Sequence, residues 1–131
     1  MKLQLKDWKV IESKLKNAEE KSRKEEDNSF GIKNGVHFPE DSDRVFIVNM
    51  DVDVTDEEFD MSIEALFVFE VSEPITEEFK MSAFPTVNAP AIAFPYMRSF
   101  VSTMTLQAGY RPVILPSINF VELAKRNSEE S

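Results

Sequence analysis

Apolar and polar side chains alternate along Asp60-Met-Ser-Ile-Glu-Ala-Leu-Phe-Val-Phe-Glu-Val-Ser72. One parity is apolar throughout and consists of Met61, Ile63, Ala65, Phe67, Phe69 and Val71. The other parity holds Asp60, Ser62, Glu64 and Glu70, interrupted by Leu66 and Val68. A period of two is typical of a half-buried β-strand. The stretch therefore predicts a strand that covers a core with one face and meets water with the other.

The segment just before it, Arg44 to Thr55, alternates in the same way. Its apolar parity contains Phe46, Val48, Met50, Val52 and Val54. Only Asp56-Glu-Glu58 separates the two apolar patterns, and a link this short favours an antiparallel hairpin. We expect the hairpin to have one buried and one acidic face.

Two further strands are expected upstream. Phe30 to Phe38 alternates, although two glycines weaken the pattern. Near the start, Leu3 and Leu5 share one parity whereas Trp8 and Val10 share the other, and a bulge near Lys6-Asp7 would reconcile them. The charged residues 16–29 lack any large apolar side chain, which indicates a solvated, mobile connection.

The carboxyl-terminal third changes to helical spacing. Apolar residues recur every three or four positions from Ala91 to Ala108, and Gly109 is a natural helix end. Pro95 should bend or delay this helix. An extended segment then leads to a short helix over residues 119–127. We predict one α+β domain over residues 1–131, with a sheet in 1–80, loop and helices in 81–127 and a mobile tail in 128–131.

Charge is distributed unevenly along the chain. The sequence has 24 acidic against 15 basic residues, a net charge of -9, which argues against nucleic acid or an anionic membrane as the main partner. Residues 40–80 are strongly acidic, whereas residues 82–121 carry only Arg98 and Arg111. Prolines interrupt this uncharged stretch, so a membrane span is not expected. The amino terminus lacks the features of a signal peptide, so we expect a cytoplasmic protein.

Catalytic and metal-binding chemistry is poorly represented. The chain has no cysteine and a single histidine, His37, so thiol nucleophiles and the usual zinc ligand sets are missing. Residues 51–56 resemble a calcium loop at first, but Asp56 stands where the loop needs glycine and Ser62 where it needs glutamate. We expect no enzyme activity, no cofactor and no metal site.

Two residue sets are candidates for binding. Asp51, Asp53, Glu64 and Glu70 would share the polar face of the hairpin, either as charge for solubility or as a docking surface for a basic partner. An aromatic and methionine-rich set lies later in the chain and consists of Phe84, Phe94, Tyr96, Met97, Phe100, Met104 and Tyr110. These side chains suit either a core and subunit interface or a groove that adapts to varied apolar ligands. A helix that is apolar nearly all round also favours self-association.

Residues 88–120 resemble the SecB family of protein-export chaperones. The resemblance rests on an apolar residue before Phe94-Pro-Tyr96, then Arg98, a helix, a loop with Pro112 and Pro116, and Asn119-Phe120. It implies a four-stranded antiparallel sheet with one long and one short helix on one face, assembled as a homotetramer that is a dimer of dimers. The carboxyl-terminal tail is shorter than in export members, and residues 16–29 are not a feature of the family.

The resemblance also implies a function. We expect an ATP-independent holdase that binds non-native polypeptides in a hydrophobic groove, in protein export or for one dedicated client such as an antitoxin. The polypeptide-binding residues would be Phe84, Phe94, Tyr96, Phe100, Met104 and Tyr110. The acidic face, with Asp51, Asp53, Glu64 and Glu70, is where export members meet the translocase ATPase. A structural or adaptor oligomer without chaperone activity is the alternative from another class.

Overall fold

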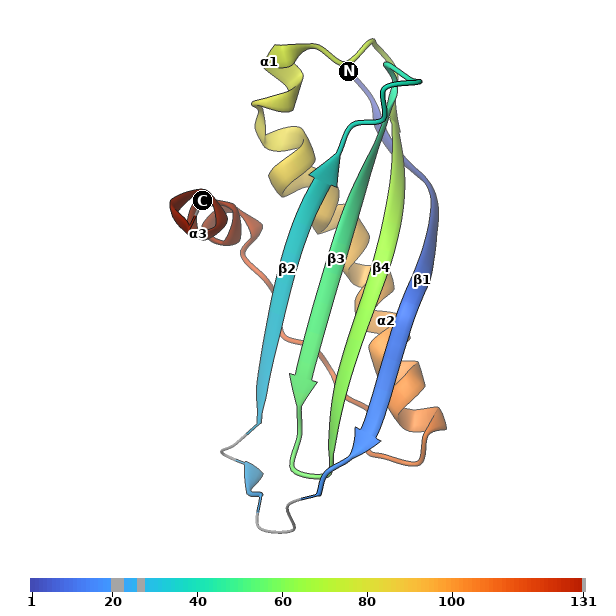
Figure 1. Ribbon diagram of the computed structural model, residues 1–131, viewed down its shortest axis with the longest axis vertical. Coiled ribbons are helices and arrows are strands. Elements are labelled where there is room, and N and C mark those ends of the chain that lie inside the picture. The colour runs from blue at the N-terminus through green and yellow to red at the C-terminus, as the bar shows by residue number, and fades with distance from the viewer. Residues whose placement is uncertain (20–22, 26–27, 131) are drawn as a thin grey trace.

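A four-stranded antiparallel sheet forms one layer of the protein and helices form the other (Figure 1). The computed structural model describes residues 1–19, 23–25 and 28–130, without the side chains of 128–130. The strands are β1 (Leu3–Asn17), β2 (Ser29–His37), β3 (Val45–Thr55) and β4 (Phe59–Val71), in the order β1-β4-β3-β2. The helices are α1 (Glu77–Lys80), the π-helical turn η2 (Phe84–Asn88), α2 (Ala89–Gln107) and α3 (Phe120–Glu130). The expected α+β class is confirmed.

The β3–β4 hairpin forms as its alternation predicts. The register places Val54 opposite Met61 and Thr55 opposite Asp60. In the turn, the Asp56 backbone N–H donates to the Phe59 carbonyl at 2.9 Å, and the Glu58 N–H donates to Asp56 Oδ2 at 3.0 Å. The apolar parity of both strands is buried and the opposite parity is not.

Strand β1 contains the expected bulge. Leu5 pairs with Phe69 and Asp7 pairs with Val68, so Lys6 is the extra residue that brings Trp8 onto the core side. A second register shift lies between Val10 and Glu12. The two shifts keep a 15-residue strand in step with β4 over its whole length.

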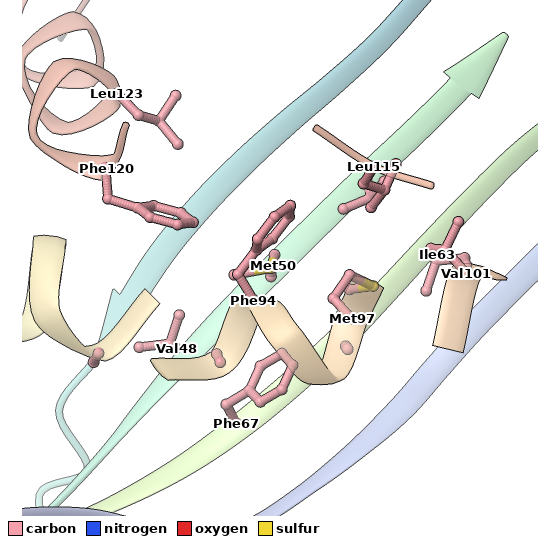
Figure 2. Close-up of a cluster of buried hydrophobic side chains, with 14 of the residues drawn as sticks. Val48, Met50, Ile63, Phe67, Phe94, Met97, Val101, Leu115, Phe120 and Leu123 are labelled. Atoms are coloured by element: carbon pink, nitrogen blue, oxygen red, sulfur yellow. The ribbon is translucent and has the colours of Figure 1, made fainter. Parts of the chain in front are cut away.

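The core lies between the sheet and α2. Figure 2 shows Met97 and Val101 of α2 facing β3 and β4, with Phe94 turned toward Phe120 of α3. The Phe94 and Phe120 rings meet at a centroid distance of 5.6 Å and an interplanar angle of 70°. Helix α3 lies beside the β2 edge and contributes Phe120 and Leu123 to this core (Figures 1 and 2).

Helix α2 differs from its sequence prediction at its start. It begins at Ala89 rather than Ala91, and Pro95 lies inside it without ending it. Pro95 is exposed, so the Ala91 carbonyl that loses its helical partner can be hydrated. The helix ends as expected: Gly109 has a φ of 97°, its N–H donates to Leu106 and the Tyr110 N–H donates to Thr105, which is a Schellman motif.

Two further boundaries differ at the ends of β1 and α3. Strand β1 includes residues 16 and 17, which were assigned to the charged connection. Helix α3 continues to Glu130, so residues 128–130 are helical rather than a tail. Residues 20–22 and 26–27 of the connection, and residue 131 of the tail, lie outside the described residues. Within the described residues no helix is long and apolar enough to cross a membrane.

Candidate functional site

The segment that returns from α2 to α3, residues 110–119, forms an apolar groove with the ends of β2 and β3. This β2 groove has a volume of about 380 Å³. It is lined by Asn28, Ser29, Phe30, Val54, Thr55 and Asp56 on the sheet side and by residues 111–116 of the return segment. Ile114 is 80% exposed at the groove although it is a large apolar residue. Exposed apolar side chains along a groove are typical of a binding surface.

One buried hydroxyl holds the return segment in place. Thr105 of α2 is fully buried, and its Oγ1 accepts a hydrogen bond from the Val113 N–H at 3.0 Å. The same hydroxyl donates back to the α2 carbonyls of Val101 and Ser102, at 2.9 and 3.0 Å. Leu115 then enters the core, and residues 111–116 around these two anchors form one wall of the β2 groove.

A polar cavity of about 310 Å³ adjoins the β2 groove. We call it the acidic cavity, because its lining contains four carboxylates, Glu25, Asp56, Glu57 and Glu58, with Asn28 and Arg111. Asn28, Asp56 and Arg111 line both spaces. An apolar site and a negatively charged site therefore share a border.

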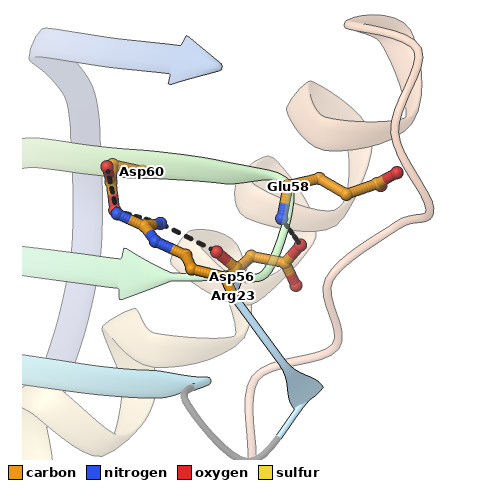
Figure 3. A network of polar contacts seen from close by, with 4 residues as sticks. All are labelled: Arg23, Asp56, Glu58 and Asp60. Atoms are coloured by element: carbon orange, nitrogen blue, oxygen red, sulfur yellow. Dashed lines mark hydrogen bonds and ion pairs between the residues drawn. The ribbon is translucent and has the colours of Figure 1, made fainter. Parts of the chain in front are cut away.

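Arg23 ties the β1–β2 connection to the turn of the hairpin beside the acidic cavity (Figure 3). Its guanidinium donates to both carboxylate oxygens of Asp60, at 2.9 and 3.0 Å, and to the Asp56 carbonyl at 2.9 Å. This bidentate hydrogen bonding holds the pKa of Asp60 below its ordinary value, against a smaller opposing effect of burial.

A second cavity, of about 450 Å³, lies at the other end of β2 against η2 and α3. Its lining includes Asn34, Lys80, Met81, Pro85 and Asn127. The Asn34 Oδ1 atom is buried and has no hydrogen-bond partner among the described residues. Apolar surface predominates here to about the same degree as in the β2 groove.

The six aromatic and methionine residues expected to bind polypeptide do not surround one cavity. Phe94 is buried against Phe120. Phe84 stacks on Phe79 at 5.6 Å beside the second cavity. The remaining residues lie elsewhere: Tyr96 and Phe100 contact Trp8 of β1, Met104 lies further along α2, and Tyr110 contacts Phe59.

All four expected acidic residues lie on the outer face of the sheet, and three of them lie close together. Asp51 and Glu64 are directly opposite each other, and Asp53 is two positions away on β3. Glu70 lies at the far end of β4, beyond Leu66 and Val68. Glu12 of β1 pairs with Glu64 and completes a row of three carboxylates across three strands. The second register shift in β1 places Glu12 there, which the sequence pattern did not reveal.

The side chains that the structure describes offer no group of three or more metal-binding residues. The site is instead an apolar groove with charged borders, a geometry suited to binding a flexible chain. The model of one protein family, described as "Preprotein translocase subunit SecB", matches residues 10–131. The chain belongs to the SecB family. Members of this family are chaperones, so the expectation that the protein is not an enzyme is confirmed.

Individual relatives match over shorter stretches. An uncharacterised protein of Methanocaldococcus jannaschii is 44% identical over 59 residues, which is 45% of this chain and 37% of that protein. The protein-export protein SecB of Magnetococcus marinus is 43% identical over 37 residues, or 28% of this chain and 24% of that protein. The matched stretches thus span well under half of these relatives.

Solved structures support the SecB-like fold over most of the chain. A SecB-like chaperone of Mycobacterium tuberculosis, in complex with a peptide from an antitoxin, superposes with a TM-score of 0.69 at 15% identity, covering 88% of this chain and 87% of that one. A protein of unknown function from Streptococcus agalactiae gives a TM-score of 0.54 at 13% identity, covering 89% and 98%. The four-stranded sheet with helices on one face is therefore an architecture shared with a chaperone.

Proposed function

We propose that this SecB-family protein is an ATP-independent holdase that binds non-native polypeptides in the β2 groove. The observation that carries the proposal is the apolar groove between Phe30 and Val54 on one side and the return segment on the other, with Ile114 exposed in it. An unfolded client exposes apolar side chains, and their burial in the groove would lower the free energy of the bound state. Mass action would then keep the client from aggregating.

The borders of the groove favour clients with basic residues. The acidic cavity brings four carboxylates next to the apolar floor. Opposite charge accelerates the encounter of a basic segment with the groove, and salt weakens this effect.

The acidic row on the outer face is proposed as a separate docking surface. Asp51, Glu64 and Glu12 lie side by side on three strands, where their like charges repel each other in part, because Lys33 is opposite Asp51 and Lys14 pairs with Glu12 at 3.3 Å. A basic partner would relieve this repulsion, and the translocase ATPase is the partner that the resemblance implies. Cytoplasmic location and assembly as a homotetramer belong to the same proposal.

Service to one dedicated client is the second candidate function. The observation that favours it is the fold shared with a chaperone solved with an antitoxin peptide. Aggregation assays with several unrelated unfolded proteins separate the two functions. A general holdase suppresses aggregation of most of them, whereas a dedicated chaperone suppresses aggregation of one.

The central test uses light scattering of a denatured, aggregation-prone protein with Ile114→Asp as the variant. The wild-type protein should suppress scattering at stoichiometric concentration. The client would bury Ile114 on binding, which contributes about 1.5–3 kcal/mol to the binding free energy. Loss of this contact should weaken client binding at least about tenfold. Val121→Asp is the matched control, because Val121 is an exposed apolar residue on α3 outside the groove. A wild-type protein that leaves the scattering unchanged would contradict the proposal.

A further inference from the structure

Strand β2 forms one edge of the sheet, so only one of its sides has a strand partner in the described part of the chain (Figure 1). The register of the sheet shows which backbone groups the other side presents. The Val71 N–H donates to the Arg44 carbonyl at 2.9 Å, so these two residues form a hydrogen-bonded pair at one end of β3 and β4. Successive residues of a strand direct their backbone groups to opposite sides. Even-numbered residues of β3 therefore bond to β4, and odd-numbered ones bond to β2.

The same alternation continues in β2. Its odd-numbered residues bond to β3, as Lys33 does opposite Asp51. Its even-numbered residues direct their N–H and carbonyl groups away from the sheet, and they are Phe30, Ile32, Asn34 and Val36. Within the residues that the structure describes, no hydrogen bond outside the sheet uses the backbone groups of these four. The outer side of β2, which we call the β2 edge, is thus a row of available donors and acceptors.

The two edges of the sheet differ in their protection against strand pairing. Strand β1 has two register shifts and four lysines along its 15 residues. Bulges and lysines on an edge strand hinder pairing with another strand. Strand β2 pairs with β3 over nine residues without a register shift, and Lys33 is the only charged residue within its bounds. The β2 edge is therefore the one that an additional strand can join.

The β2 groove and the second cavity adjoin this edge at its two ends. Phe30 lines the β2 groove, whereas Asn34 and Val36 line the second cavity. Ala124 and Asn127 of α3 also line the second cavity, which therefore lies between this part of β2 and α3. The apolar side chains of β2 are only partly buried, in contrast to the apolar parity of β3. A strand added at the edge would cover them further.

We propose that a client segment adds to β2 as a fifth, antiparallel strand, so that the site selects segments in which apolar and polar residues alternate. The proposal rests on the proposed function of the β2 groove and specifies its substrate class. Residues of a hydrogen-bonded antiparallel pair lie directly opposite each other and share one face of the sheet. The client residues opposite Phe30, Ile32 and Val36 would thus bond to β2 through their backbones and contact its apolar side chains.

The two spaces set the length of the client segment. Phe30 and Val36 are six positions apart, and a strand that rises about 3.4 Å per residue covers about 20 Å between them. An extended segment of about seven residues would place one apolar side chain at the β2 groove and another at the second cavity. A helix cannot bind in this way, because its backbone groups already bond within the helix.

A client fits the β2 edge better than a second copy of this protein does. Two β2 strands that are related by a two-fold axis and overlap over all nine residues would place Lys33 opposite Lys33. Like charges directly opposite each other destabilise a strand pair. A client with a neutral or acidic residue at this position avoids the repulsion.

The test measures binding of labelled, N-methylated peptides by fluorescence anisotropy. Three peptides share one sequence of alternating apolar and polar residues. One is unmodified, one is methylated at the backbone nitrogens of three apolar residues, and one at those of three polar residues. Methylation of the apolar residues removes N–H groups that would face β2 and should weaken binding at least about thirtyfold. Methylation of the polar residues leaves these groups intact and should change the affinity less than about threefold.

Asn34 offers a matched pair of variants. Asn34→Pro removes an outward N–H but no hydrogen bond to β3, and proline is tolerated at such positions of edge strands. It should weaken binding of the unmodified peptide about tenfold, because a hydrogen bond is lost and the ring occupies the edge. Asn34→Ala removes the same side chain, keeps the N–H and should bind the peptide like the wild type. If Asn34→Pro unfolds, the methylated peptides with the wild type still decide the question.

Different results would overturn different parts of the proposal. Equal binding of the two methylated peptides would refute strand addition and leave the β2 groove as a site for side chains alone. Sensitivity to methylation of the polar residues would refute the antiparallel direction, since a parallel strand directs those N–H groups to β2. An Asn34→Pro variant that folds and binds like the wild type would contradict the role of the edge. If the unmodified peptide does not bind either, the proposed function fails together with the inference.

Discussion

Thr105 is the residue on which the geometry of the groove depends most directly. It is a fully buried polar side chain, yet its hydroxyl both donates and accepts hydrogen bonds. The bond to the Val113 N–H joins two segments eight residues apart and fixes where the return segment leaves α2. Burial of this hydroxyl costs little because its donor and its acceptor both have hydrogen-bond partners.

Thr105→Val tests this role. Valine keeps the shape of threonine but leaves the Val113 N–H without its acceptor, so the free energy of unfolding should fall by about 1–2 kcal/mol. Urea denaturation measures the change, and peptide affinity for the β2 groove should fall with it. Thr103→Val, at an exposed position on the same helix, should alter the stability by less than about 0.5 kcal/mol. Equal midpoints for Thr105→Val and the wild type would contradict this role.

The sequence did not identify the residues of the β2 groove, because it does not show which apolar side chains are buried in the core. Large aromatic residues such as Phe94 were natural candidates because they bind apolar ligands well, but the same property drives them into the core. Ile114 has no distinguishing motif, and its exposure follows from the Thr105 anchor and the burial of Leu115. These are tertiary contacts outside any repeating pattern, so periodicity carries no signal for them.

At the scale of elements, alternation along the strands was highly informative. The parity change between Leu5 and Trp8 predicted a bulge, and the register confirms it at Lys6. The second shift, at Ile11, falls in a stretch of mixed polarity where neither parity is apolar enough to reveal it. The hairpin of β3 and β4 was predictable for the opposite reason, because both strands have one wholly apolar parity.

The link between β1 and β2 depends on Arg23 and Asp60, and its stability should depend on pH. The pKa of Asp60 is lowered in the folded protein, so the ion pair stabilises the fold above the unfolded pKa of about 4. This contribution is lost as the pH falls through the lower folded pKa. Asp60 is half exposed, so solvent screening limits the contribution to about 0.5–1 kcal/mol.

Asp60→Asn isolates this contribution. At pH 7 the variant should unfold at a lower urea concentration than the wild type, and the difference should shrink as the pH falls below about 4. Asp53→Asn provides the control, since it removes an exposed charge from the neighbouring strand and leaves the Arg23–Asp60 hydrogen bonds in place. A difference that stays constant from neutral to acidic pH would show that the charge of Asp60 is not responsible.

For the whole molecule, the two faces of the protein divide the sequence charge between them. The strongly acidic residues 40–80 supply the outer face of the sheet, where Asp51, Glu64 and Glu12 adjoin. The nearly uncharged residues 82–121 supply the helical layer and the return segment. A net charge of -9 therefore describes neither face, and each face suits a different partner.

The helical layer keeps an exposed stripe on α2 that the monomer does not cover, apolar at Ile92, Tyr96 and Leu106 and hydroxyl-bearing at Ser99 and Thr103. Ile92, Tyr96, Ser99, Thr103 and Leu106 follow one another at intervals of four, three, four and three residues along exposed α2. Leu106 is 57% exposed, and this spacing is that of a helix seam that pairs with another helix. We infer that a second copy covers the stripe, as one of the two interfaces that a dimer of dimers requires.

Ile92→Asp tests this interface by sedimentation equilibrium. The wild type should have the mass of four chains, and the variant should dissociate to a smaller species, because an aspartate in an apolar seam loses its hydration and removes an apolar contact. The dissociation constant should rise by at least about a hundredfold. Val121→Asp makes a similar change in the first turn of α3, outside the stripe, and should preserve the mass. A wild-type monomer would contradict the inference, and an Ile92→Asp variant that keeps the full mass would move the interface away from α2.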